Sequence, residues 1–111
     1  MAFQDITGAR LGQVEMTTDY IAMYTCPANT RTYIKDMSIC NTTAGALTFY
    51  VSLVPDQATV GAANAIYYNT AIAAEDIIHW TGAQIMNAGD TIQVKGSASG
   101  VTITVTGGEA I

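Results

Sequence analysis

Side chains alternate with a period of two over several short stretches of this chain. Residues 101–106 read Val-Thr-Ile-Thr-Val-Thr, and in residues 47–53 the apolar positions Leu, Phe, Val and Leu alternate with Thr, Tyr and Ser. Because successive side chains of a β-strand point to opposite faces, this period is typical of a strand with one buried face. No window longer than about ten residues shows uninterrupted helical apolar spacing. The chain is therefore expected to be all-β.

The amino-acid composition favours the same fold class. The chain has 111 residues, with 16 Thr, 17 Ala and only three Leu, whereas a helical protein of this size would be richer in Leu, Glu and Lys. Half of the residues are apolar and 12% are charged, which excludes an intrinsically disordered chain. This length suits one domain. Because so few residues are charged, we expect other subunits to cover much of the surface.

Turn signals divide the chain into seven or eight short strands. Strands are predicted at 20–25, 31–41, 47–53, 65–68, 76–81, 91–95 and 101–106. The strands on either side of the turns at 42–45 and 96–100 are expected to pair as hairpins, and Gly107 and Gly108 are expected to end the last strand. Regular short strands of this kind predict a two-sheet antiparallel sandwich, of either the immunoglobulin-like or the jelly-roll type.

The first 18 residues show no alternation and are interrupted by glycines. We expect residues 1–18 to form an extended or irregular N-terminal arm, followed by the β-sandwich domain at 19–111. The large apolar side chains of this arm are Phe3, Ile6, Leu11 and Val14. Their spacing fits neither one helix face nor one strand face, so the arm is expected to be disordered in the isolated protein. It is expected to become ordered when a neighbouring subunit or another binding partner buries these side chains.

The charge balance argues against several kinds of partner and compartment. The net charge is −5 with only four Lys and Arg, whereas phosphate binding requires clustered basic residues, so no nucleic-acid partner is expected. No apolar run reaches the roughly 18 residues of a membrane-spanning helix, so no membrane partner is expected. The N-terminal residues lack the pattern of a signal peptide, which predicts a protein that stays in the cytoplasm of the cell that makes it.

The inventory of reactive side chains predicts neither an enzyme nor a metal site. The single histidine, His79, lies between bulky apolar residues of a predicted strand and is expected to be a surface or interface residue. Cys26 and Cys40 are the other N/S ligands, and no spacing typical of zinc sites is present. We therefore expect no catalytic residues, no metal and no cofactor, and two free thiols.

Tyrosine is the unusual side chain of this sequence, with six Tyr against two Phe. Tyr is enriched at protein interfaces because it combines apolar area with a hydrogen bond, and we name Tyr20, Tyr24 and Tyr67 as interface candidates beside the four arm residues. Tyr67 and Tyr68 are adjacent in a predicted strand, so one of them must face away from the core. Two other interpretations stay open: ordinary half-buried sheet residues, or a carbohydrate site formed by Trp80 with nearby tyrosines.

Five segments, in this order, carry a resemblance to known proteins. They are Tyr-Thr-Cys-Pro-Ala-Asn-Thr at 24–30, Ile-Cys-Asn-Thr-Thr at 39–43, Ala-Asn-Ala-Ile at 63–66, Asn-Ala-Gly-Asp-Thr-Ile at 87–92 and Ala-Ser-Gly-Val-Thr-Ile-Thr-Val-Thr-Gly at 98–107. The chain from Tyr24 to Ile111, about four-fifths of its length, resembles small structural proteins of tailed bacteriophages.

The resemblance implies a virion β-sandwich attached to the head or the tail, with no catalytic residues. We therefore expect a capsid decoration or cement protein that is assembled in the host cytoplasm and located in the virion. Its expected partners are the major capsid protein and further copies of itself, as a homotrimer. The alternatives are a tail, neck or fibre component of the same fold and, from an unrelated class, a carbohydrate-binding module.

Overall fold

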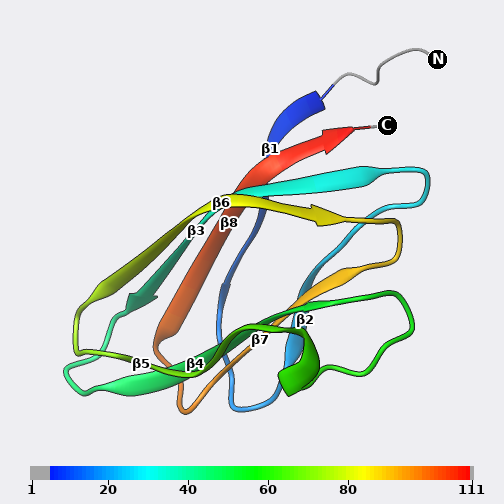
Figure 1. The fold of residues 1–111 in the computed structure, drawn as a ribbon. Helices are drawn as coiled ribbons and strands as arrows, with labels where there is room; N and C mark the ends of the chain where they lie inside the picture. The colour runs from blue at the N-terminus through cyan, green and yellow to red at the C-terminus, as the bar shows by residue number, and fades with distance from the viewer. Residues whose placement is uncertain (1–5, 111) are drawn as a thin grey trace.

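The computed structural model describes residues 6–110, which form two four-stranded antiparallel sheets packed face to face (Figure 1). The strands are β1 Ile6–Glu15, β2 Ile21–Thr25, β3 Arg31–Asn41, β4 Leu47–Val54, β5 Ala65–Ile72, β6 Ile77–Met86, β7 Thr91–Gly96 and β8 Val101–Ala110, and one 3-10 turn, η1, spans Ala62–Asn64. Sheet A has the order β1-β8-β3-β6, and sheet B has the order β2-β7-β4-β5. The predicted all-β, two-sheet sandwich is confirmed.

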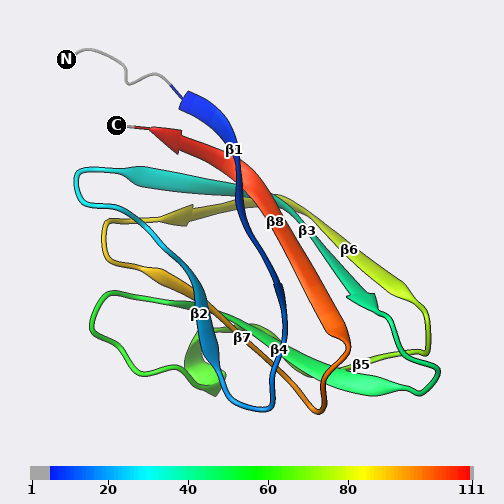
Figure 2. The same ribbon diagram turned by 180° about the vertical axis from the view of Figure 1, so that it is seen from behind.

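The pairing of the strands selects one of the two predicted sandwich types. β1 pairs with β8, β2 with β7, β3 with β6 and β4 with β5, as in one long hairpin whose outgoing and returning halves are rolled up together. Rolling places successive pairs alternately in sheet A and sheet B (Figures 1 and 2). This is the jelly-roll arrangement of eight strands in two sheets, and the immunoglobulin-like alternative does not have this order.

The two predicted hairpins are wrong. β3 and β4 lie in different sheets, and so do β7 and β8, so each short connection carries the chain from one sheet to the other. At the first crossing the side-chain amide of buried Asn41 donates to the carbonyl oxygens of Gly45, Ile72 and Ala73, at 2.8, 3.2 and 3.2 Å. A turn of this length suits either a hairpin or a crossing, and these hydrogen bonds of Asn41 stabilise the crossing.

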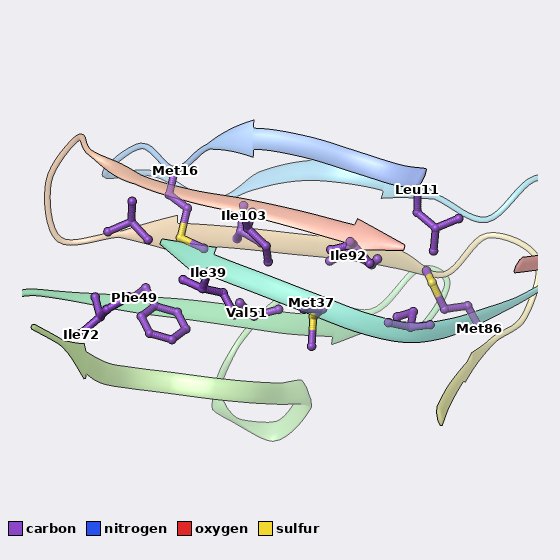
Figure 3. Packing of buried hydrophobic residues seen from close by; sticks show 14 of the residues in the cluster. Leu11, Met16, Met37, Ile39, Phe49, Val51, Ile72, Met86, Ile92 and Ile103 are labelled. Atoms are coloured by element: carbon purple, nitrogen blue, oxygen red, sulfur yellow. The ribbon is translucent and has the colours of Figure 1, made fainter. Parts of the chain in front are cut away.

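A single hydrophobic core fills the space between the sheets (Figure 3). The period-two residues supply it as predicted: Ile92 and Val94 point inward from β7, and Val101, Ile103 and Val105 point inward from β8. Other fully buried members are Met16, Ile34, Met37, Ile39, Phe49, Val51, Ile72 and Met86. Each such side chain contributes about 1.5–3 kcal/mol on burial, so the inward faces hold the two sheets together.

The N-terminal segment does not form a separate arm in the described part of the chain. β1 pairs with β8 along its whole length, from Ile6 opposite Ala110 to Glu15 opposite Thr102. Leu11 is buried in the core and Val14 packs against it, so neither side chain is available to a groove on another subunit. A bulge at Leu11 changes the side-chain alternation, which explains the uneven apolar spacing. Phe3 lies outside the described residues.

The last strand also continues beyond its predicted end. β8 runs through Gly107 and Gly108 to Ala110 and stays paired with β3. A Cβ atom added at Gly107 would overlap the backbone carbonyl oxygen of Tyr33. The glycine therefore permits a close approach of two backbones within sheet A, instead of ending the strand.

Candidate functional site

Three tyrosines and one lysine form a row across the outer face of sheet B, which we call the tyrosine row. In strand order its members are Tyr20 just before β2, Lys95 on β7, Tyr50 on β4 and Tyr68 on β5. Lys95 and Tyr50 lie directly opposite each other in the ladder between β7 and β4. Each alternates with buried neighbours in its strand, so the same period that builds the core turns these side chains outward.

The members of the row contact one another. The rings of Tyr20 and Tyr50 meet edge to face with centroids 6.0 Å apart, and those of Tyr50 and Tyr68 do so at 5.1 Å. The ammonium group of Lys95 lies 5.1 Å from the centroid of Tyr20 and 4.7 Å from that of Tyr50. Such aromatic pairs contribute about 0.5–1.5 kcal/mol each, and an exposed cation–π contact about 0.5–1 kcal/mol. These contacts hold the four side chains in a fixed arrangement.

The row is only partly covered by its own chain. Tyr68 is 56% exposed, whereas Tyr20, Tyr50 and Lys95 are half-buried. Among the residues whose side-chain exposure the structure describes, the other exposed large hydrophobic residues are Ile77 and Ile85, which lie on sheet A. Rigid aromatic side chains with a polar tip are the residues that contribute most binding energy at protein interfaces. The row is therefore suited to contact with another protein.

Of the four members of the row, only Tyr20 was predicted from the sequence as an interface residue. Tyr50, Tyr68 and Lys95 were missed, although a usable signal was present for one of them. Tyr50 stands between Phe49 and Val51, which occupy the apolar positions of the alternating strand, and it must therefore point outward.

The other two predicted interface tyrosines serve the fold. Tyr67 packs its ring against that of core residue Phe49, with centroids 5.1 Å apart. The hydroxyl of Tyr24 on sheet B donates to Oε2 of Glu109 on sheet A at 2.5 Å and lies 2.7 Å from Oγ1 of Thr32. Burial, together with the bond to this carboxylate, raises the pKa of the Tyr24 phenol well above its usual value. Tyr24 thus ties the two sheets together.

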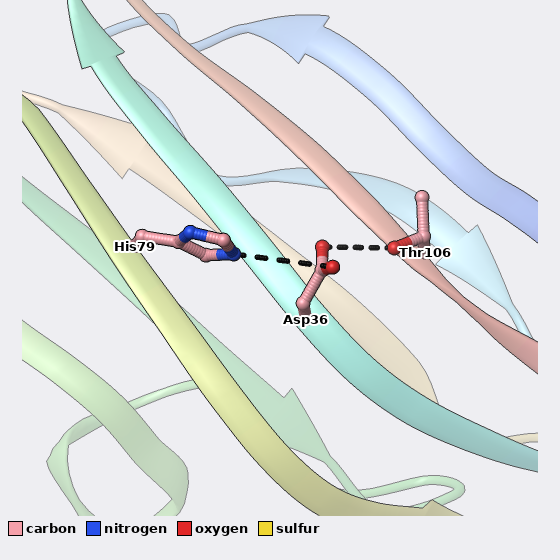
Figure 4. A network of polar contacts seen from close by, with 3 residues as sticks. All are labelled: Asp36, His79 and Thr106. Carbon is pink, nitrogen blue, oxygen red and sulfur yellow. Dashed lines mark hydrogen bonds and ion pairs between the residues drawn. The ribbon is translucent and has the colours of Figure 1, made fainter.

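The single histidine lies on the outer face of sheet A, in a short chain of polar contacts (Figure 4). Nε2 of His79 is 3.9 Å from Oδ2 of Asp36, and the hydroxyl of Thr106 donates to Oδ1 of Asp36 at 2.8 Å. Asp36 stands between the other two side chains, so the hydroxyl contacts the carboxylate and not the imidazole. These three residues therefore do not form the nucleophile–base pair of a catalytic triad.

The remaining candidates for a ligand or metal site are weak. Between residues 6 and 110 no three His, Cys, Asp or Glu side chains are grouped closely enough to hold a metal ion. Both cysteines are free, and Sγ of buried Cys26 donates to the carbonyl oxygen of Thr30 at 3.3 Å. A hollow of about 240 Å³ on sheet A is lined by Gly8, Tyr33, Lys35, Gly107 and Gly108. This volume is below the roughly 300–1,000 Å³ of small-molecule pockets.

Helical structure within the described residues is limited to the 3-10 turn η1. No helix within the described residues is long and apolar enough to cross a membrane.

Comparisons with known proteins give a similarity in structure but not in sequence. No protein-family model and no curated protein matches the sequence. The fold is similar to a chain in a structure titled "Structure of infectious bursal disease virus Gx strain", with a TM-score of 0.48 and 8% sequence identity. The similarity covers 96% of this chain and 32% of that chain, so this chain spans about a third of its length.

Proposed function

We propose that this protein is a structural component of a phage virion, and more specifically a capsid decoration protein that binds the assembled head. The observation that carries the proposal is the tyrosine row, a preorganised aromatic surface on a small domain. The order of the five sequence segments, which resembles that of small phage structural proteins, supports the choice of partner. The major capsid protein is the partner that this function requires.

The mechanism is adhesion. Each copy places the exposed ring of Tyr68 and the edges of Tyr20 and Tyr50 against capsid subunits on both sides of a joint. Because only the assembled shell offers both sides, binding stabilises the assembled state by mass action. Contacts within the row fix the rings before binding, so little side-chain entropy is lost when the interface forms.

Lys95 favours a negatively charged group on the partner surface. It is one of only four basic residues in a chain of net charge −5, and its ammonium group lies over two aromatic rings, those of Tyr20 and Tyr50. A carboxylate on the capsid surface facing Lys95 would compensate this charge and fix the orientation of the bound protein. We expect substitution of Lys95 by Glu to abolish binding and substitution by Arg to preserve it.

Counting copies distinguishes the head from the tail. Quantitative mass spectrometry of purified virions should find this chain in many copies per particle, in proportion to the major capsid protein. A dozen copies or fewer would contradict decoration of the head and favour the alternative, a tail, neck or fibre component. The homotrimer implied by the resemblance stays a prediction, which the molecular mass in solution tests.

Variants on the two sheets test the binding surface itself. Particles that lack the protein should bind Tyr68→Ala at least about 30-fold more weakly than the unmodified chain, as expected for an interface hot spot worth about 2 kcal/mol. The matched control is Thr104→Ala, which removes a side chain from the outer face of sheet A. Equal binding by the two variants would refute the role of the row. Trp80 packs against the core and does not join the row, so binding on a glycan array would require another site.

A further inference from the structure

The hollow on sheet A is suited to one side chain of a partner and not to a free ligand. Gly8, Gly107 and Gly108 line it without side chains, and Tyr33 and Lys35 are the other lining residues. Tyr33 alternates with buried neighbours in β3, so the hollow opens on the outer face of the sheet. Its volume is about 240 Å³. Because an apolar cavity of about 150 Å³ already accepts benzene, this hollow has room for a large aliphatic side chain.

Basic side chains surround the hollow. Besides Lys35, Arg10 lies two residues after Gly8 on β1, and Arg31 lies two residues before Tyr33 on β3, so both share the outer face with the hollow. All three are exposed, and they are three of the four basic residues of a chain whose net charge is −5. The ion pair found among residues 6–110 involves none of them. The hollow therefore favours an apolar side chain that is flanked by carboxylates.

The opposite end of sheet A carries a side chain of this kind. Ile77, the first residue of β6, is 61% exposed, the largest value among the exposed large hydrophobic residues that the structure describes. Glu75 and Asp76 precede it and are also exposed. We call these three residues the acidic tip. Glu15 on β1 lies in the same cross-strand row as Ile77 and adds a further negative charge at this end of the sheet.

Hydrogen bonds hold the acidic tip in a fixed conformation. The backbone amide of Glu75 donates to the carbonyl oxygen of Thr43 at 3.1 Å, and that of Asn41 donates to the carbonyl oxygen of Asp76 at 2.9 Å. The backbone amide of Ile77 donates to Oδ1 of Asp76 at 2.8 Å. Because the tip is already ordered, little conformational entropy is lost when it binds a partner.

The tip and the hollow of one chain lie too far apart to meet. Tyr33 of the hollow and Cys40, which is opposite Ile77, are seven residues apart on β3, or about 23 Å at the rise of a strand. Figure 1 shows the turn that leads into β6 at one end of sheet A and the paired ends of β1 and β8 at the other. A contact between the two surfaces therefore requires two copies.

We propose that the acidic tip of one copy binds the hollow of another. Ile77 fills the hollow, and Glu75 and Asp76 face the surrounding basic side chains, which are those of Arg10, Arg31 and Lys35. Two tips repel each other, and so do two basic rims, so the charges allow only the contact between unlike surfaces. Such contacts build a reciprocal pair of copies or, when each copy binds a different neighbour, a closed ring.

This contact is independent of the proposed function. It uses the two ends of sheet A, whereas the tyrosine row lies on the outer face of sheet B and stays free. Loss of self-association without loss of particle binding would refute only the contact between tip and hollow. Loss of particle binding in a protein that still associates would refute only the decoration role.

Mass measurement gives the first test. Sedimentation equilibrium at tens of micromolar should give at least twice the chain mass of 11.7 kDa for the unmodified protein. Ile77→Lys should give a monomer, because it brings a positive charge to the basic rim, whereas Ile77→Leu should still associate. The matched control is Ala22→Lys, which adds the same charge at an exposed position of sheet B and should also still associate. A monomeric unmodified chain, or association that survives Ile77→Lys, would overturn the proposal.

A mixture of two variants tests whether unlike surfaces meet. Gly8→Leu fills the hollow and should be monomeric, and it should fold because a Cβ atom at Gly8 has no atom nearer than 4.0 Å. Ile77→Lys keeps its hollow and Gly8→Leu keeps its tip, so an equimolar mixture of these monomers should form a dimer with one chain of each. Circular dichroism shows that both are folded. A mixture of folded variants that stays monomeric, or a Gly8→Leu variant that associates by itself, would overturn the proposal.

Discussion

The outer faces of the two sheets differ, although their inner faces are chemically alike. Both inner faces carry buried Ile and Val side chains, sheet B adds Phe49, and the two faces pack into a single core. On sheet A the central outer side chains bond one another: the amide of Gln13 donates to Thr104 at 3.0 Å, and Thr106 donates to Asp36. The exposed aliphatic side chains of this sheet, Ile77 and Ile85, lie on its edge strand β6. On sheet B the outer face carries the tyrosine row.

This difference separates the residues that build the fold from those available for binding. The polar groups of sheet A are partly satisfied within the chain and are easily hydrated, so they provide little driving force for contact with a partner. The rings of sheet B retain apolar area that a partner can bury. Variants on the inner face and on the outer face of a sheet should therefore differ in their effects on stability and on binding.

The largest effect is expected inside sheet A, where the backbones of β8 and β3 approach most closely. Gly107→Ala should prevent folding or lower the free energy of unfolding by more than about 4 kcal/mol, because the new methyl group overlaps the carbonyl of Tyr33. The matched control is Gly8→Ala, whose methyl group has no atom nearer than 4.0 Å. Urea unfolding measures both, and equal stability of the two variants would contradict the close approach.

The next effect compares the inner and outer faces of sheet B. Phe49→Ala should lower the free energy of unfolding by about 3–5 kcal/mol, because it empties a fully buried ring position. Tyr68→Ala loses one exposed ring pair and should cost no more than about 1.5 kcal/mol. Thermal or urea unfolding tests the pair, and a Tyr68 variant as unstable as the Phe49 variant would show that the row is structural.

A smaller, pH-dependent effect is expected at Tyr24, which ties the sheets together. Its pKa is higher in the folded protein than the usual value of about 10, so the folded state holds this proton more tightly than the unfolded state. The resulting stabilisation is complete below about pH 10 and declines as the pH rises further. Tyr24→Phe should lose about 1.5–3 kcal/mol at neutral pH through the missing bond to Glu109.

Absorbance titration gives a direct check on Tyr24. In the folded protein part of the tyrosine absorbance change should occur above the usual pH range, and this late phase should disappear in Tyr24→Phe. Tyr20→Phe is the control and should retain it. A titration in which Tyr24→Phe leaves the late phase unchanged would assign the raised pKa to another tyrosine.

The smallest effect is expected on the outer face of sheet A. His79 and Asp36 are 56% and 41% exposed and 3.9 Å apart, and such pairs contribute at most about 1 kcal/mol. His79→Ala should therefore change the free energy of unfolding by less than this amount and leave particle binding unchanged. A loss of binding in His79→Ala would transfer the functional surface from sheet B to sheet A.

The sequence predicted strands better than it predicted their partners. β3 and the start of β4 have the predicted boundaries because alternation and turn residues act locally. The hairpins failed because a short turn has the same residues whether the chain stays in one sheet or crosses to the other. β5 and β6 continue beyond their predicted ends at 68 and 81, because pairing with a neighbouring strand stabilises the additional residues. Such pairing leaves no pattern in the local sequence.

Bulges and glycines account for the other errors. The bulge at Leu11 breaks the alternation of β1, so an edge strand of sheet A was predicted as an arm. Gly107 was interpreted as a strand end, whereas it allows β8 to pass close to β3. The tyrosine row required the strand order of sheet B, because Tyr20, Tyr50 and Tyr68 are far apart in sequence and meet only when β2, β7, β4 and β5 lie side by side.

A density map of the virion at side-chain resolution tests the proposed binding surface most directly. We predict many copies on the head, with the rings of Tyr20, Tyr50 and Tyr68 in contact with capsid subunits and the outer face of sheet A directed to solvent. Copies bound through the outer face of sheet A, with the tyrosine row in solvent, would contradict the assignment of function to sheet B.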